Sequence, residues 1–138
     1  MQSLLSQKEL SRGATKVFEN DKCLVVVPHT WEASCKYGAG TKWCTTSKET
    51  NEHWKSYTEL GVKFYYILTK DKPITDPLYK VAIAVYQHLQ NNELPLPPLE
   101  TYNALDENID DPTPFLTAYN IPLKLFKRFL RDAMYSKP

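Results

Sequence analysis

Short hydrophobic runs separated by polar turns occupy the first part of the chain, a pattern typical of β-strands. Residues 15–18 and 23–27 are rich in β-branched and aromatic side chains. They flank the polar stretch 19–22, whose Asn-Asp pair favours a turn. We therefore predict a β-hairpin whose second strand ends at Pro28.

Three further runs predict strands at residues 62–68, 79–86 and 100–104. The first two are expected to be antiparallel neighbours, joined by a polar link that contains proline. Period-two alternation divides residues 79–86 into two faces: Tyr79, Val81, Ile83 and Val85 on one, and Lys80, Ala82, Ala84 and Tyr86 on the other. The small alanines would let a helix pack closely against their face.

Helical periodicity indicates two longer helices. Thr46 and Glu49 form a capping-box pattern for a helix over residues 47–60, which Gly61 would end. Pro122 is suited to the first turn of a terminal helix. The apolar residues of that helix recur at helical spacing: Phe126, Phe129, Leu130 and Ala133.

The remaining segments are less regular. Residues 4–10 predict a short helix, residues 31–35 a helical turn within the irregular stretch 28–46, and the prolines of residues 87–98 an extended loop. Taken together, the elements predict one α+β domain over residues 1–138. Its core would be a small, mainly antiparallel sheet with two or three packed helices.

The charge of the chain is balanced in total but uneven along its length. The 138 residues include 17 basic and 16 acidic side chains, a net charge of +1. The net charge is +3 over residues 1–70, −6 over 71–120 and +4 over 121–138. General binding to duplex nucleic acid is disfavoured, because it usually requires a strongly basic face.

Cysteine usage and hydropathy indicate a cytoplasmic protein. The three cysteines have neither CxxC nor zinc-finger spacing, so we expect reduced thiols and no metal site. No window approaches the ~18 apolar residues of a membrane span, and the N-terminus lacks the pattern of a secretory signal. No membrane partner is expected, whereas the aromatic content allows a homo-oligomer.

Residues 30–47 form the segment best suited to chemistry. From Ala33 to Lys48 there are three lysines and no acid, and the segment leads into the N-terminus of the predicted helix, where an anion is favoured. Glycine allows close backbone approach, and aromatic rings offer a stacking face for a base. The predicted ligand-binding residues are Lys36, Tyr37, Gly38, Gly40, Thr41, Lys42, Trp43, Thr46, Ser47 and Trp54.

The same segment resembles a motif common in uncharacterised bacteriophage-encoded proteins. The block T-x-E-A-S-x-x-Y-G-x-G-T-K-W-C-T begins at Thr30, and it is followed by a Tyr-Tyr-Ile strand and by a short acidic segment at residues 100–108. The resemblance covers about residues 15–110. It implies a phage setting, and hence the cytoplasm of a bacterial host, but no particular chemistry.

A second part of the sequence resembles ADP-ribosyltransferases of the His-Tyr-Glu type. The strand end at residues 27–30 supplies a histidine, and residues 37–57 combine a Y-G-x-G block with a helix that contains serine and ends in tyrosine. The resemblance implies that His29 and Tyr57 would hold NAD and that Glu100 would be the catalytic acid.

Three hypotheses for function follow. In the first, the protein binds a nucleotide-like anion at residues 30–57 without any cofactor and sequesters a nucleotide signal of host antiviral defence. In the second, it is an enzyme that transfers ADP-ribose from NAD. In the third, it inhibits a host protein through the acidic stretch 100–111, by a surface that resembles nucleic acid.

Overall fold

The computed structural model describes residues 13–47, 49–86 and 99–135, so the expectations for residues 4–10 and 87–98 lie outside the described residues. Five strands form one antiparallel sheet whose strand order follows the chain. The strands are β1 (Ala14–Glu19), β2 (Cys23–Pro28), β3 (Val62–Thr69), β4 (Lys80–Tyr86) and β5 (Leu99–Tyr102). The predicted hairpin and the antiparallel pairing of its neighbours are confirmed.

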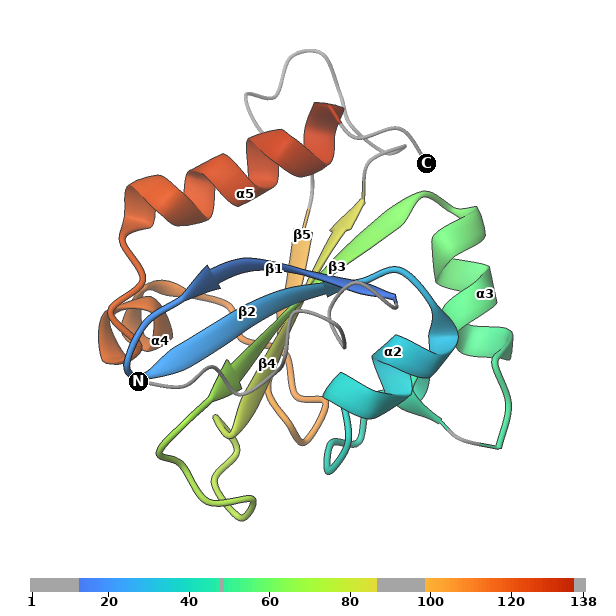
Figure 1. Ribbon diagram of the computed structural model, residues 1–138, viewed down its shortest axis with the longest axis horizontal. Helices are drawn as coiled ribbons and strands as arrows, with labels where there is room; N and C mark the ends of the chain where they lie inside the picture. Colours follow the sequence, from blue (N-terminus) through green and yellow to red (C-terminus); the bar gives the residue numbers. More distant parts are fainter. Residues whose placement is uncertain (1–12, 48, 87–98, 136–138) are drawn as a thin grey trace.

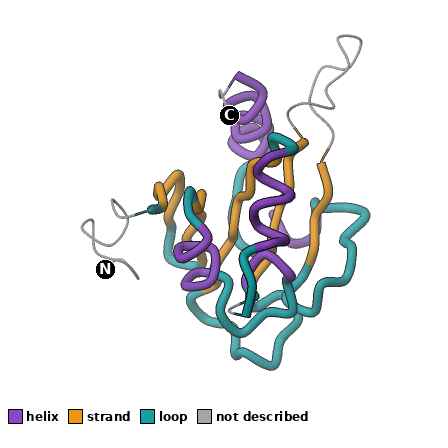
Figure 2. The backbone as a smooth tube through the Cα atoms, turned by 90° about the vertical axis from the view of Figure 1, so that its right-hand side faces the viewer, coloured by secondary structure: helices purple, strands orange, loops and turns teal. Residues whose placement is uncertain are grey.

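Helices cover both faces of the sheet, which confirms the α+β class. The described helices are α2 (Trp31–Tyr37), the 3-10 turn η1 (Cys44–Thr46), α3 (Glu52–Glu59), α4 (Thr113–Ala118) and α5 (Leu123–Tyr135). Figure 1 shows α4 and α5 on one side of the sheet and α2 and α3 on the other. In Figure 2 the side of α2 and α3 faces the viewer, and these two helices lie in front of the strands. No helix in the described part of the chain is long and apolar enough to cross a bilayer.

The face under α4 and α5 is an aliphatic and aromatic core. Val81, Ile83 and Val85 of β4 point into it, as their alternation predicted. Phe126 and Phe129 of α5 pack on the same face. The helices are also held by polar contacts at their backbone: the Tyr65 hydroxyl donates to the Phe129 carbonyl at 2.8 Å, and the Asn20 amide donates to the Tyr119 carbonyl at 2.9 Å.

The opposite face holds a second core beneath α2 and α3. Its aromatic residues form a chain of ring contacts from Trp54 through Phe64 to Tyr66 and Trp43. The rings of Trp54 and Phe64 are stacked with centroids 5.7 Å apart. Trp54 is therefore a core residue that fixes α3 on β3.

A buried polar network attaches the segment between β2 and α3 to this face. The Tyr66 hydroxyl lies 2.7 Å from Ser34 Oγ of α2 and 2.9 Å from Thr45 Oγ1 of η1. Ser34 Oγ in turn donates to the Thr45 carbonyl at 2.9 Å. One tyrosine side chain thus connects a strand, a helix and a 3-10 turn.

The glycines of residues 30–46 stand where a larger side chain would not fit or where the backbone has a positive φ. A Cβ atom on Gly38 would lie 2.0 Å from Thr46 Cγ2 and 2.8 Å from the Ser34 carbonyl. Gly40 has φ +85°, a conformation that favours glycine. At the end of α3, Gly61 has φ +78°, in agreement with its predicted role in ending that helix.

The start of α3 differs from the prediction. The helix begins at Glu52, with Asn51 as its N-cap, and not at Ser47. The Thr46 hydroxyl donates to the Trp43 carbonyl at 2.8 Å, so it closes the 3-10 turn and does not cap α3. The amide of Glu52 donates instead to Thr50 Oγ1 at 3.2 Å.

The Tyr66 network predicts a measurable contribution to stability. Tyr66→Phe leaves the buried Thr45 hydroxyl without its partner and removes one of the two hydrogen bonds of Ser34 Oγ, so we expect the free energy of unfolding in urea to fall by roughly 1–3 kcal/mol. Tyr79→Phe, which removes the hydroxyl of a half-buried tyrosine outside this network, is the control. If the effects of Tyr66→Phe and Thr45→Val were strictly additive, the coupling between the two hydroxyls would be refuted.

Candidate functional site

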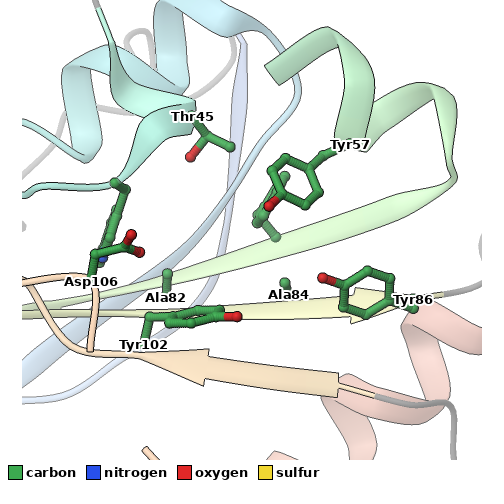
Figure 3. Close-up of a pocket in the computed structure, with 9 residues that line it drawn as sticks. Thr45, Tyr57, Ala82, Ala84, Tyr86, Tyr102 and Asp106 are labelled. Atoms are coloured by element: carbon green, nitrogen blue, oxygen red, sulfur yellow. The ribbon is translucent and has the colours of Figure 1, made fainter. Parts of the chain in front are cut away.

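A cleft lies over β4 and β5, on the same face of the sheet as α3 (Figure 3). It contains about 110 Å³ of space for water-sized molecules, which is enough for one ring but not for a whole dinucleotide. Most of its lining is aromatic. The lining residues are Trp43, Thr45, Tyr57, Phe64, Ala82, Ala84, Tyr86, Tyr102 and Asp106.

The floor of the cleft consists of small side chains. Ala82 and Ala84 lie on one face of β4, as their alternation predicted. The expected close packing of a helix on these alanines is wrong: α3 packs on the aromatic residues of β3, and a cavity lies above the alanines. Because the alanine methyl groups are small, they do not fill the space between the surrounding aromatic rings, and this space is the cleft.

One wall comes from the segment that the sequence singled out. The Trp43 ring lies 4.8 Å from the ring of Tyr66, and its indole N–H donates to the Asn103 carbonyl at 2.7 Å. The backbone amide of Lys42 also donates to the Ala104 carbonyl, at 2.9 Å. These bonds join residues 38–43 to the turn that follows β5. They therefore hold Trp43 in a fixed position relative to the turn that contains Asp106.

The opposite wall comes from α3 and β3. The ring of Tyr57 meets the ring of Phe64 edge to face, with centroids 5.7 Å apart. Figure 3 shows Tyr57 of α3 and Tyr86 of β4 on either side of the cleft at the end away from Asp106. Tyr57, which the resemblance to ADP-ribosyltransferases implied would hold NAD, is thus a lining residue.

Glu100 stands between two of the tyrosines. In the register of β4 and β5 it pairs with Ala84, while Tyr102 pairs with Ala82. Its carboxylate accepts hydrogen bonds from the hydroxyls of Tyr102 and Tyr86. Burial, the hydrogen bond to Glu100 and the nearby carboxylate charge together raise the pKa of Tyr86 above its ordinary value. This tyrosine therefore remains a neutral hydrogen-bond donor at physiological pH.

Asp106 lies at the other end of the cleft, in a tight turn after β5. Its φ is +65°, and its amide donates to the Asn103 carbonyl at 3.0 Å. The Asn103 side chain accepts from the amides of Leu105 and Glu107 at 2.9 and 3.0 Å. Partial burial raises the pKa of the Asp106 carboxyl. None of the described residues that line the cleft is basic.

The predicted anion site at residues 36–47 is arranged differently from the expectation. Tyr37 is buried in the core, Thr41 donates to the Gly38 carbonyl, and the Ser47 carbonyl accepts from the indole of Trp31. Lys36 and Lys42 are exposed. Because α3 begins at Glu52, its N-terminus carries an acidic residue and is not formed by Thr46 and Ser47.

The three residues of the ADP-ribosyltransferase hypothesis are not gathered in one place. Tyr57 and Glu100 both lie next to Tyr86 at the cleft. His29 follows the end of β2, where its ring nitrogen bonds Thr15 Oγ1 at 2.7 Å, and it does not line the cleft. Burial and the charge of Lys63 lower the pKa of His29.

Sequence reasoning missed several lining residues, namely Thr45, Phe64, Ala82, Ala84, Tyr86, Tyr102 and Asp106. The alternation over residues 79–86 carried a usable signal, since it put both alanines and Tyr86 on one face. Within the described residues, no group of three or more His, Cys, Asp or Glu side chains is placed to hold a metal ion. The chain matches no protein-family model, no curated protein and no solved structure.

A buried lysine lies on the same face of β4, outside the cleft. Lys80 is 8% exposed, and its Nζ donates to the Ala39 carbonyl at 2.7 Å. Burial lowers the pKa of Lys80 from 10.5 to about 8. The lysine thus attaches the loop of residues 38–40 to the sheet. Its burial removes the ammonium group from water, which disfavours the charged form.

This pKa predicts how stability depends on pH. The folded-state value lies below the unfolded one, so the unfolded chain binds more protons between about pH 8 and pH 10.5, and stability rises across that window. Relative to Lys80→Met, the wild type should gain up to roughly 3 kcal/mol in urea unfolding as pH increases through it. Burial raises the pKa of Cys23 to about 12, which acts in the opposite direction but equally in both proteins. Parallel stability curves for the two proteins would contradict the prediction.

Proposed function

We propose that this protein binds a nucleotide-like small molecule and that the ring of this ligand occupies the cleft over β4 and β5. The observation that carries the proposal is the lining: aromatic rings from four different elements surround a small apolar floor. A concave, largely apolar site with a few convergent polar groups is the usual form of a small-molecule site. Aromatic side chains stack well on the flat faces of bases.

The polar groups around the cleft match the edge of a heterocyclic ring. The Tyr86 hydroxyl already donates to Glu100 and the Thr45 hydroxyl bonds Tyr66, so their oxygens serve as acceptors for a ring N–H or amino group. The Asp106 carboxylate also accepts from an N–H group. A phosphate would remain outside, because the cleft has room for one ring and its described lining offers no cation. Lys42 is exposed, adjoins Trp43 in the chain and pairs through its amide with Ala104, so it is the lysine suited to meet a phosphate there.

The resemblance to bacteriophage-encoded proteins supports a biological role for such binding. A phage protein that holds a nucleotide with high affinity would withdraw a nucleotide signal from host antiviral defence. This role requires binding without chemical change, whereas an ADP-ribosyltransferase would release nicotinamide from NAD.

A pair of matched substitutions tests the location of the site. Ala84→Leu fills the cleft, whereas Ala39→Leu adds the same side chain at the exposed groove beside α2. Thermal unfolding should be measured with NAD, ADP-ribose and cyclic di- and oligonucleotides, because a ligand that binds only the folded state raises the midpoint. We expect at least one of these to stabilise the wild type and Ala39→Leu but not Ala84→Leu.

Two other outcomes would overturn the proposal. Loss of stabilisation in Ala39→Leu alone would place the site in the groove beside α2. No stabilisation by any of the nucleotides would sink small-molecule binding and leave the acidic stretch 100–111 as the surface to test against host proteins. Nicotinamide released from NAD by the wild type would establish the enzyme in place of the binding protein.

A further inference from the structure

We propose that the cleft selects a planar aromatic ring that carries a positive charge, such as a pyridinium. This inference rests on the proposed function, because it concerns the ring that the cleft would hold. It differs from the expectation drawn from residues 30–47, which concerned an anion. Three features of the cleft support it.

The first feature is the balance of charge. Asp106 lies at one end of the cleft, and Glu100 stands beside the other, against Tyr86 and Tyr102. The described lining contains no lysine, arginine or histidine. An anionic group inside the cleft would therefore face two carboxylates without a counter-charge, whereas a cation would be attracted by both.

The second feature is the aromatic lining itself. The faces of aromatic rings carry negative electrostatic potential and attract cations, most strongly where water is excluded. Tyr57, Tyr86 and Tyr102 surround the space in Figure 3, and Trp43 and Phe64 complete the lining. A flat cation can stack on one ring while its edge meets another, so it would use both the shape and the potential of the site.

The third feature is that both acids are held in place. Asp106 sits in a turn that the Asn103 side chain closes by accepting from the backbone on each side, at Leu105 and Glu107. The Glu100 carboxylate is positioned by two tyrosine hydroxyls. Carboxylates that are already held in place need no rearrangement when a ligand enters. Their attraction for a cation is therefore not reduced by a free-energy cost of ordering the side chains.

Ligand pairs that differ in ring charge test the inference directly. Oxidised and reduced nicotinamide mononucleotide carry the same phosphate, but only the oxidised ring is a cation. The second pair is 1-methylnicotinamide, whose ring is a cation, and nicotinamide, whose ring is neutral. By isothermal titration calorimetry we expect the charged member of each pair to bind roughly tenfold more tightly. Equal affinities within both pairs, or tighter binding of the neutral members, would overturn the inference while leaving the proposed function intact.

Asp106→Asn assigns the preference to this carboxylate. Asparagine tolerates a positive φ as aspartate does, so the turn should persist, and unchanged thermal unfolding would verify it. We expect the variant to lose most of the preference for the charged ring, with little change in the affinity for the neutral one. The control is Glu107→Gln, which neutralises the adjacent exposed acid outside the cleft lining and should keep the preference.

The remaining outcomes are equally decisive. A preference that survives Asp106→Asn unchanged would refute the role given to that carboxylate. An equal loss in Asp106→Asn and Glu107→Gln would mean a general effect of surface charge and would also refute it. Failure of all four compounds to bind would overturn the selection for a cationic ring. The thermal-unfolding experiment with nucleotides and Ala84→Leu would then decide separately whether the cleft binds any nucleotide.

Discussion

The hydroxyl of Tyr66 is the constraint on which the arrangement of the cleft depends. This buried hydroxyl lies 2.7 Å from Ser34 Oγ of α2 and 2.9 Å from Thr45 Oγ1 of η1, so it joins both elements to β3. These buried bonds attach the segment between β2 and α3 to β3. Their geometry places Trp43 against the ring of Tyr66 and Thr45 at the edge of the cleft.

The two faces of the sheet have different roles because of the alternation along β4. Valine and isoleucine on one side fill a closed core under α4 and α5. The alanines on the other side are too small to reach across to a neighbour. The aromatic residues around them are held by their own contacts: Trp43 by the Asn103 carbonyl and Tyr57 by its edge-to-face contact with Phe64. A cleft with rigid walls results from these packing preferences.

Much of the fold could be predicted because it is encoded locally. The hairpin, the strands and the two faces of β4 follow from alternation, and Gly61 ends α3 through its own backbone freedom. The start of α3 could not be read this way. The Thr46 hydroxyl can bond either to a helix amide or to the Trp43 carbonyl, and in the folded chain it bonds this carbonyl within η1.

The candidate site was harder to predict for a similar reason. The glycines and aromatic residues at 37–43 are conspicuous in the sequence, yet Gly38 and Tyr37 serve internal packing. Tyr102 and Asp106 are inconspicuous, and they line the same cleft as Trp43 because β5 pairs with β4 and the following turn bonds to the 38–43 segment. Sequence spacing contains no direct record of such long-range pairing.

The proposed position of the ligand ring is the cleft over β4 and β5. The three tryptophans report on it separately, since Trp43 lines the cleft, Trp31 lines the groove beside α2 and Trp54 is packed against Phe64. Their indole N–H signals should be followed by nuclear magnetic resonance during titration with oxidised nicotinamide mononucleotide. We expect a saturable shift of the Trp43 signal with the Trp31 signal unchanged, whereas a shift confined to Trp31 would place the ligand in the groove beside α2 and rule out the cleft.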